Sequence, residues 1–352
     1  MTIIPSISIC VPTRNRASLL RATLSAMQRQ TRPYMELIVG DDASEDNTKD
    51  VVASFRDPRI RYLRHERNVG IYANWNALVE CCSGDYVCIY HDHDHYFDTI
   101  LEASANLLDR HPLMSFVHTA LTTVDSEGQV CSVDIRDFPE AMQGWCLREM
   151  LANSLHSPVM AATAMIRRTA LSKAGPFQFK EYGLGCDKHM WFRLAGEGCT
   201  VGYVADVQAQ IREREKGTAT AAISWDAIFG SWCMWKDEIA EQYADHPAAL
   251  ALATRRMNRV QALQTLTLSL RALILEPDDI WSREEQRVVP AMGGPGRVLY
   301  RIARSSRAVR GLLRAFILPL HYWSISYRAW VAKRRAQAHL RARPLPLSRV
   351  GV

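Results

Sequence analysis

The chain has 352 residues, enough for about two domains. It is 48% hydrophobic and 23% charged, a globular mixture that can bury a sizeable core. No basic segment followed by an apolar core opens the sequence, and no run of about 20 apolar residues occurs in it. We therefore expect neither a signal peptide nor a transmembrane helix, and we expect the body of the protein to be cytoplasmic.

The net charge of +6 is distributed unevenly along the chain. From Gln286 to the C-terminus there are 14 Lys and Arg residues and no Asp or Glu. The rest of the chain carries 29 basic and 37 acidic residues, a net charge of −8. An acidic body with a basic tail predicts an anionic partner for the tail.

The nine cysteines are typical of reduced, mostly buried thiols. Their number is odd, Cys81 and Cys82 are adjacent, and no C-x-x-C pair is present. This pattern argues against both a disulfide framework and a zinc ribbon.

The first hundred residues alternate between short β-branched runs and segments with helical spacing. Short apolar runs predict strands, whereas apolar residues three or four positions apart predict helices. Ser44 is the expected N-cap of the second helix. The expected order is strand 7–11, helix 19–27, strand 37–39, helix 45–55, strand 60–63, helix 72–82 and strand 86–90.

This alternation predicts an α/β fold with a mostly parallel sheet. Polar clusters follow three of the expected strands, at 13–15, 41–42 and 92–94. Ligands of such sheets bind beyond the carboxyl ends of the strands. Because the three clusters come from separate segments, we expect them to converge on one binding site.

Beyond residue 115 the expected elements are more widely spaced. Segments 116–118 and 130–133 predict a hairpin that turns at Glu127 and Gly128. A further strand is expected at 163–166 and a helix at 187–194, and the chain from Trp225 onward is mostly helical in pattern.

The cluster Asp92-His93-Asp94 has the composition of a metal site. Two carboxylates one residue apart can share a divalent ion and a ribose, and oxygen ligands suit Mg²⁺ or Mn²⁺. Asp94 is the expected metal ligand, and Asp92 is expected to contact the ribose or the metal through water. The alternative is a solvated turn, which the position after a buried strand disfavours.

Five motifs in order resemble family 2 glycosyltransferases. They cover residues 7–100 densely and 160–215 more thinly. The first, at 9–16, is similar to the family's P-T-x-N-R opening, and the second, at 36–48, to its E-L-I-V-x-D-D-x-S-x-D-x-T segment. The remaining motifs are Asn68-Val69-Gly70, Asn74-Trp75-Asn76 and Ser83-Gly84-Asp85-Tyr86.

The resemblance implies a GT-A fold, a nucleoside-diphosphate-sugar donor and a hydroxyl acceptor. It places Asp92 and Asp94 at the metal, with Mn²⁺ or Mg²⁺ as the cofactor. His95 stands where the family commonly has a third Asp, which leaves open whether it holds the metal or only fills the position. The residues implied for nucleotide-sugar binding are Pro12, Thr13, Asn15, Asp41, Asp42, Asn68, Asn76, Asp92 and Arg214.

The catalytic base implied by the family is Asp187, at the start of the expected helix 187–194. A carboxylate at this place is also the commonest helix N-cap, and the two roles are compatible. The implied reaction is a direct displacement with inversion at the anomeric carbon. The family's Arg-x-His pair is replaced by Arg212-Glu213-Arg214, so Arg214 is expected to bind diphosphate by charge alone.

The implied catalytic domain spans 1–220, with a nucleotide-binding half at 1–110 and an acceptor-binding half at 111–220. Residues 221–352 form the helical, basic remainder. Within it, 297–318 places Val298 and Ile302 on an apolar face and Arg297, Arg301 and Arg304 on the opposite face.

A helix of this kind fits the cytoplasmic surface of an anionic membrane, where the protein would be peripheral and its acceptor a saccharide or lipid-linked saccharide of the cell envelope. A helix packed on the catalytic domain is the main alternative, and nothing upstream indicates nucleic-acid binding. For the whole protein, the competing hypotheses are an inactive nucleotide-sugar-binding protein and a metal-dependent hydrolase.

Overall fold

The computed structural model describes residues 4–125, 127–144, 146–147, 159–178, 186–196, 199–212 and 293–306, with isolated residues between 236 and 309. The described residues fall into two compact units. The first contains all those up to Arg212, and the second contains those from Lys236 onward. The arginine at 214, expected to bind diphosphate, lies outside the described residues.

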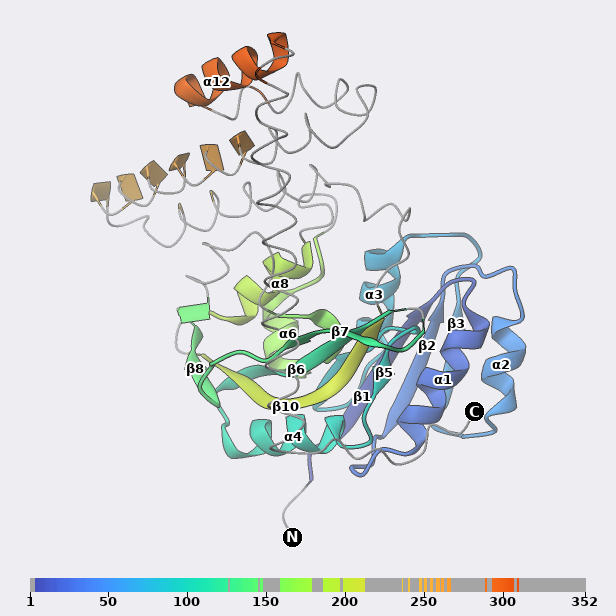
Figure 1. Cartoon of the computed structure of the whole chain (residues 1–352). Coiled ribbons are helices and arrows are strands. Elements are labelled where there is room, and N and C mark those ends of the chain that lie inside the picture. Colours follow the sequence, from blue (N-terminus) through green and yellow to red (C-terminus); the bar gives the residue numbers. More distant parts are fainter. Residues whose placement is uncertain are drawn as a thin grey trace. The chain divides into compact units, whose positions relative to one another are not determined.

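The first unit opens with alternating strands and helices, as the sequence predicts (Figure 1). Ser44 is not the N-cap of the second helix, because that helix begins only at Thr48. The Ser44 hydroxyl instead accepts a hydrogen bond from the backbone of Asn15. The elements are β1 (Ile7–Thr13), α1 (Ala17–Gln28), β2 (Glu36–Asp41), α2 (Thr48–Ser54), β3 (Ile60–Arg64), α3 (Ile71–Glu80) and β4 (Tyr86–Ile89).

The rest of this unit adds strands that extend the same sheet. The predicted hairpin is confirmed, with β6 antiparallel to β7 and Gly128 at a φ of +80° in the turn. The elements are β5 (His95–Tyr96), α4 (Ile100–Arg110), β6 (Met114–Val124), β7 (Val130–Asp134), β8 (Ala141–Gln143), η1 (Ala161–Thr163), β9 (Met165–Arg167), α6 (Arg168–Ala174), α8 (Cys186–Leu194) and β10 (Thr200–Arg212).

The described strands form one mixed sheet in the order β3-β2-β1-β4-β9-β6-β10-β5, with β7 on β6 and β8 on β10. The four strands β3, β2, β1 and β4 are parallel, and so are β6 and β10. β9 lies antiparallel between β4 and β6 and joins the two parallel groups. The predicted α/β fold with a mostly parallel sheet is therefore confirmed.

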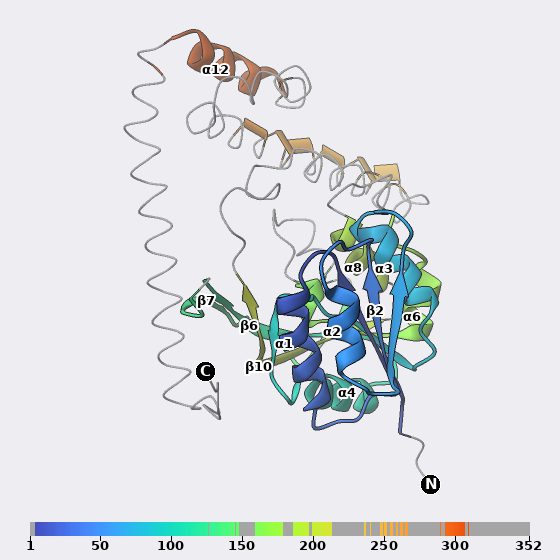
Figure 2. The same cartoon turned by 90° about the vertical axis from the view of Figure 1, so that its right-hand side faces the viewer.

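Helices cover both faces of the first four strands (Figure 2). α1 and α2 lie against one face, and α3 lies against the other, as right-handed crossovers require. Burial on both sides explains why β1, β2 and β4 are apolar runs and do not alternate with polar residues. The helices contribute Leu20, Leu24 and Met27 from α1 and Trp75 and Leu78 from α3 to this interior.

Gly40 allows α3 to approach the end of β2. A Cβ atom at this position would lie 2.4 Å from Asn74 Oδ1 and 2.8 Å from Leu78 Cδ1. The Asn74 amide donates to the Gly40 carbonyl at 2.8 Å. The helix is therefore fixed against the strand immediately before Asp41, the first carboxylate of the second polar cluster.

The second unit contains α12 (Gly293–Ser305), which begins before the predicted tail helix 297–318 and overlaps it at 297–305. It turns Tyr300 and Ala303 inward and leaves Val298, Leu299 and Ile302 exposed. The predicted tail helix beyond residue 309 lies outside the described residues. Among the helices that the structure describes, none is long and apolar enough to span a bilayer.

Candidate active site

The parallel register brings the three polar clusters together at one edge of the sheet. Thr13, at the end of β1, is paired with Asp41 at the end of β2. On the other side of β1, Cys10 is paired with Ile89, the last residue of β4. The Thr13 hydroxyl donates to Asp92 Oδ2 at 2.7 Å, so the loop after β4 is fixed directly to the end of β1.

Asp92 is buried, and its carboxylate is fully engaged by protein groups. Besides the Thr13 hydroxyl, it accepts bonds from Arg16 at 3.2 Å and from His93 Nδ1 at 2.8 Å. Burial by itself would raise the pKa of Asp92, but the bonds from His93 and Thr13 and the charge of Arg16 outweigh it and lower the pKa. Asp92 is therefore a fixed negative charge.

Asp94 is also buried and ionised, but its partners differ. Its Oδ2 lies 3.1 Å from His91 Nδ1, and its Oδ1 accepts from the backbone N–H of Arg212 at 3.0 Å. Burial opposes ionisation, but the hydrogen bond of His91 and the charges of His91 and His93 outweigh it and lower the pKa. The contact with Arg212 joins the end of β10 to this loop.

His91, His93 and Asp94 form a group that fits a metal ion. One ligand atom from each lies within 4.8 Å of the other two. The imidazole rings of His91 and His93 are stacked, with their centroids 5.4 Å apart. His91 Nε2 is buried and has no hydrogen-bond partner among the described residues. This donor set suits a transition metal better than Mg²⁺, which takes oxygen ligands.

The group differs in part from the pair expected from sequence. Asp92 is not in it, and the role of Asp92 at the metal stays a prediction. His95 is not in it either, because its exposed side chain lies on β5 against Phe97. The sequence signal for the histidines was their position on either side of Asp92, and the turn at Asp92 and His93 brings the two imidazoles together.

Asp41 is fully buried, and its carboxylate is bonded to the loop after β2 and to side chains of β3. Its Oδ1 accepts from the Ser44 backbone N–H at 2.8 Å. Its Oδ2 accepts from the Tyr62 hydroxyl and from Arg64 at 3.2 Å. These contacts fix the carboxylate at the strand end, and its predicted role at the nucleobase stays a prediction.

Asp42 orders the segment before α3. It accepts from the backbone N–H groups of Val69 at 2.6 Å and Gly70 at 3.0 Å. Asn68, which is exposed, accepts a bond from the same Gly70 N–H through its side chain. The backbone φ of +89° at Gly70 is one that glycine adopts without strain. The motif Asn68-Val69-Gly70 is thus explained by a loop that Asp42 holds.

Asn15 connects the loop after β1 to the loop after β2. Its backbone N–H donates to Ser44 Oγ at 2.9 Å, and its side-chain oxygen accepts from the Glu45 N–H at 2.7 Å. Its φ is +51°, a value that asparagine tolerates better than most residues. Pro12 lies in β1 opposite Gly40. Both residues remain predicted contacts of the nucleotide.

Asn76 bonds to both backbone polar groups of Phe177. Its amide nitrogen donates to the Phe177 carbonyl at 3.1 Å, and its oxygen accepts from the Phe177 N–H at 2.8 Å. The ring of Phe177 packs edge-on against that of Trp75, with the ring centroids 5.3 Å apart. The centroids of the Trp75 and His91 rings are 5.9 Å apart. Asn76 therefore fixes the segment around Phe177 near His91, a contact that no sequence motif indicates, and its predicted role at the nucleotide sugar stays a prediction.

Asp187 lies inside the first turn of α8, one residue after its start at Cys186, and is therefore not at the N-cap. Burial raises the pKa of Asp187, and the backbone hydrogen bond and charge of Lys188 offset this only in part. The charge of His91 also acts on Asp187, so the two side chains are close enough to interact. Burial lowers the pKa of Lys188 to about 8. The site thus combines two carboxylates that ionise easily with one that does not.

Buried carboxylates at the carboxyl ends of parallel strands define an α/β protein with a candidate ligand site at that edge of the sheet. Residues 8–173 match the family described as Glycosyl transferase family 2. The GT-A fold is confirmed by the crystal structure of S. aureus TarS 1-349 in complex with UDP-GlcNAc, with a TM-score of 0.59 at 17% identity. That likeness covers 95% of this chain and 92% of TarS 1-349.

Curated relatives are similar in sequence. The putative teichuronic acid biosynthesis glycosyltransferase TuaG of Bacillus subtilis is 23% identical over 66% of this chain and 88% of its own length. A GalNAc(5)-diNAcBac-PP-undecaprenol β-1,3-glucosyltransferase of Campylobacter jejuni is 38% identical, over 26% of this chain and 30% of its own. The Escherichia coli glucosyltransferase WfgD is 30% identical over 29% of this chain and 40% of its own.

The contacts of Asn76 lead to a prediction about stability. Asn76→Ala should lower the free energy of unfolding by about 1–3 kcal/mol, because it leaves the buried backbone polar groups of Phe177 unpaired. Urea denaturation measures this loss. Asn47→Ala is the matched control, since the Asn47 side chain makes no cap hydrogen bond to α2. Equal stability of the two variants would contradict the assigned role.

Proposed function

We propose that this protein is an inverting, metal-dependent member of glycosyltransferase family 2 that moves a sugar from a nucleoside-diphosphate sugar to a hydroxyl group. The observation that carries the proposal is that the pKa values of three aspartates of the candidate active site are shifted in opposite directions. Asp92 and Asp94 have lowered pKa values, whereas burial raises the pKa of Asp187. Environments that separate carboxylate pKa values in this way divide charge stabilisation from proton transfer.

Asp187 is the proposed general base. The acceptor hydroxyl oxygen forms a bond to the anomeric carbon while its proton passes to the Asp187 carboxylate. The bond between the anomeric carbon and the phosphate oxygen breaks at the same time, and its electron pair leaves with the nucleoside diphosphate. A raised pKa makes the carboxylate a stronger base than an exposed aspartate, which favours this role.

The donor is proposed to bind along the strand ends that carry Pro12, Thr13, Asp41 and Asp92. The hydrogen bond of Thr13 to Asp92 fixes the pair before any ligand arrives, so little ordering is required on binding. The related proteins handle UDP-GlcNAc or undecaprenol-linked saccharides. We accordingly propose a UDP-sugar as the donor and a saccharide or lipid-linked saccharide of the cell envelope as the acceptor.

Asp94, with His91 and His93, would hold the metal ion. A divalent ion bound there would neutralise the charge that develops on the leaving diphosphate. Asp94 is suited to this role because its pKa is lowered and the backbone N–H of Arg212 positions its carboxylate. Arg212 also donates from its side chain to the His93 carbonyl at 3.4 Å, which orders the loop between the histidines.

Asp187→Asn tests the proposed base. Release of nucleotide from UDP-sugars in the presence of Mn²⁺ and acceptor should fall by at least about 10²-fold, the usual contribution of a general base, while donor affinity stays unchanged. In the wild type, kcat/KM should decline with acid at a higher pH than an ordinary aspartate would give.

The stability of this variant provides the control. A raised pKa in the folded state means that the ionised carboxylate destabilises the fold as pH rises through that pKa. The neutral amide should therefore leave the melting temperature at pH 7 equal or higher. Loss of donor binding, or a lower melting temperature, would show that Asp187 is structural.

The proposed metal group predicts selectivity that can be measured without turnover. The protein alone should bind Mn²⁺ more tightly than Mg²⁺, because two imidazoles suit a transition metal. His93→Ala should weaken Mn²⁺ affinity by about tenfold or more. The electron paramagnetic resonance signal of free Mn²⁺ measures this affinity. His95→Ala is the matched control, and equal effects of the two substitutions would contradict the assignment.

We also propose that the basic tail contacts the cytoplasmic face of an anionic membrane, as a peripheral protein. Support comes from α12, where Val298, Leu299 and Ile302 are exposed beside the exposed Arg297 and Arg301. Apolar and basic side chains on one accessible surface fit a lipid interface.

Sedimentation with phosphatidylglycerol vesicles tests the membrane proposal. Replacing Arg297 and Arg301 together by Gln should reduce the sedimented fraction, because each loses attraction to anionic lipid. Replacing Arg255 and Arg259 by Gln removes the same charge from exposed positions elsewhere in the second unit. A similar loss for both pairs would indicate unspecific charge attraction, and no loss for either would overturn the proposal.

A further inference from the structure

A pocket lies at the edge of the sheet where β4 begins, opposite the edge that carries the candidate active site. Tyr86 opens β4, whereas Asp92 and Asp94 follow its other end. Arg167 is paired with Tyr86 in the sheet register and therefore lies at the same edge. The cavity has a volume of about 590 Å³, within the range of about 300–1,000 Å³ that small-molecule sites occupy.

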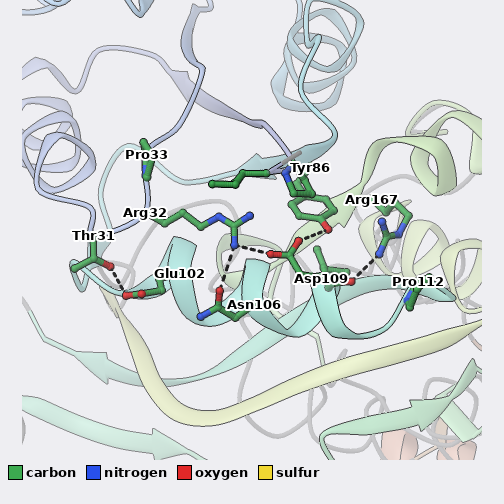
Figure 3. Close-up of a pocket in the computed structure, with 12 residues that line it drawn as sticks. Thr31, Arg32, Pro33, Tyr86, Glu102, Asn106, Asp109, Pro112 and Arg167 are labelled. Atoms are coloured by element: carbon green, nitrogen blue, oxygen red, sulfur yellow. Dashed lines mark hydrogen bonds and ion pairs between the residues drawn. The ribbon is translucent and has the colours of Figure 1, made fainter. Parts of the chain in front are cut away.

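The loop before β2 contributes an arginine with an unusual environment. The Arg32 side chain is only 10% exposed, and its Nη1 donates to Asp109 at 2.7 Å and to Asn106 at 3.2 Å. Its Nε and Nη2 are buried and have no hydrogen-bond partner in the described part of the chain. Figure 3 shows that the bonded nitrogen faces α4, while the other two nitrogens lie on the edge of the guanidinium away from that helix.

The two unpartnered donors of Arg32 are adjacent on the guanidinium group. Nε–H and Nη2–H lie on one edge of the planar guanidinium and point in nearly the same direction, which is the fork that binds both oxygens of a carboxylate. A buried polar group without a partner is unfavourable, so this edge is prepared for a ligand that accepts two hydrogen bonds.

The other charged groups of the pocket are already engaged. Arg167 donates to the carbonyls of Met114 and Leu108, and Glu102 accepts from the Thr31 hydroxyl at 2.7 Å. Asp109, besides binding Arg32, accepts from the Tyr86 hydroxyl at 2.8 Å. Figure 3 shows the bonds of Thr31 to Glu102 and of Tyr86 to Asp109 along α4. Among the charged groups that line the pocket, Arg32 is therefore the one whose buried donors have no partner in the described part of the chain.

The charges and walls of the pocket narrow the ligand class. Arg32 and Arg167 are balanced by Glu102 and Asp109, so a dianion such as phosphate would meet two carboxylates, whereas a monoanion would meet less repulsion. The remaining walls are largely apolar and can cover a hydrocarbon body. They are formed by Ile4, Pro5, Pro33, Leu108, Pro112 and the ring of Tyr86.

We propose that this pocket binds an organic monocarboxylate with an apolar body, whose carboxylate is held by the Nε and Nη2 of Arg32. The site is separated from the nucleotide-sugar edge by the length of β4, and the proposal does not depend on which donor or acceptor the enzyme uses. No covalent step is involved.

Saturation-transfer NMR on the full chain tests the proposal with a series of arylalkyl carboxylates that begins with 4-phenylbutyrate. At least one member of the series should bind, and its neutral alcohol and phenyl phosphate should bind at least about tenfold more weakly. Excess UDP should not displace the carboxylate. Displacement by UDP, or the absence of binding by the whole series, would overturn the proposal.

Two variants assign the contact to Arg32. Arg32→Lys keeps a charge that can reach Asp109 but removes the fork, and it should weaken carboxylate binding about tenfold or more. Arg29→Lys is the matched control, because Arg29 forms an exposed ion pair with Asp98 outside the pocket. Equal binding by Arg32→Lys and wild type would contradict the proposal.

A second route covers the case in which Arg32→Lys fails to fold. Pro112 lies exposed in the turn after α4 and lines the pocket without touching the proposed fork. Pro112→Trp should fill part of the cavity and weaken binding of the same carboxylate, while transfer activity is retained. Unchanged binding in this variant would place the ligand elsewhere.

Discussion

The hydrogen bond from Thr13 to Asp92 is the contact on which the candidate site depends. It joins the ends of β1 and β4, two strands that are adjacent in the sheet but whose interacting residues are 79 positions apart in sequence. The parallel register makes this contact possible, because it places the carboxyl ends of both strands at one edge. The hydrogen bond thereby positions the loop after β4, which carries the histidines on either side of Asp92.

Burying several carboxylates at that edge requires compensation, and the structure provides it from the ends of neighbouring strands and from the loops that follow them. Asp41 and Asp42 are held largely by backbone groups and side chains of the segments that follow β2 and β3. Asp92 and Asp94 stay ionised through neighbouring histidines and Arg16. Asp187 lacks comparable compensation, and its pKa is raised for that reason.

The two edges of the sheet carry different chemistry. At the carboxyl edge, buried negative charge and imidazole nitrogens favour a cation and the groups that a cation can bind. At the amino edge, Arg32 offers two buried donors above an apolar cavity, which favours an anion. Strand β4 runs from one edge to the other. Tyr86, its first residue, binds Asp109 in the pocket at the amino edge. His91, two residues after its end, binds Asp94 in the candidate active site.

The sequence by itself determined the elements up to residue 90 and the strand ends on which Thr13, Asp41 and Asp92 lie, because hydrophobic periodicity is a local property. Only the tertiary structure decided which side chains meet. It directed Asn76 to the backbone of Phe177, and it grouped Asp94 with His91 and His93. The contact between Asn76 and Phe177 spans 101 residues and depends on helix packing that no local pattern encodes. The group at 91–94 is local in sequence, and the turn at Asp92 and His93 sets its geometry.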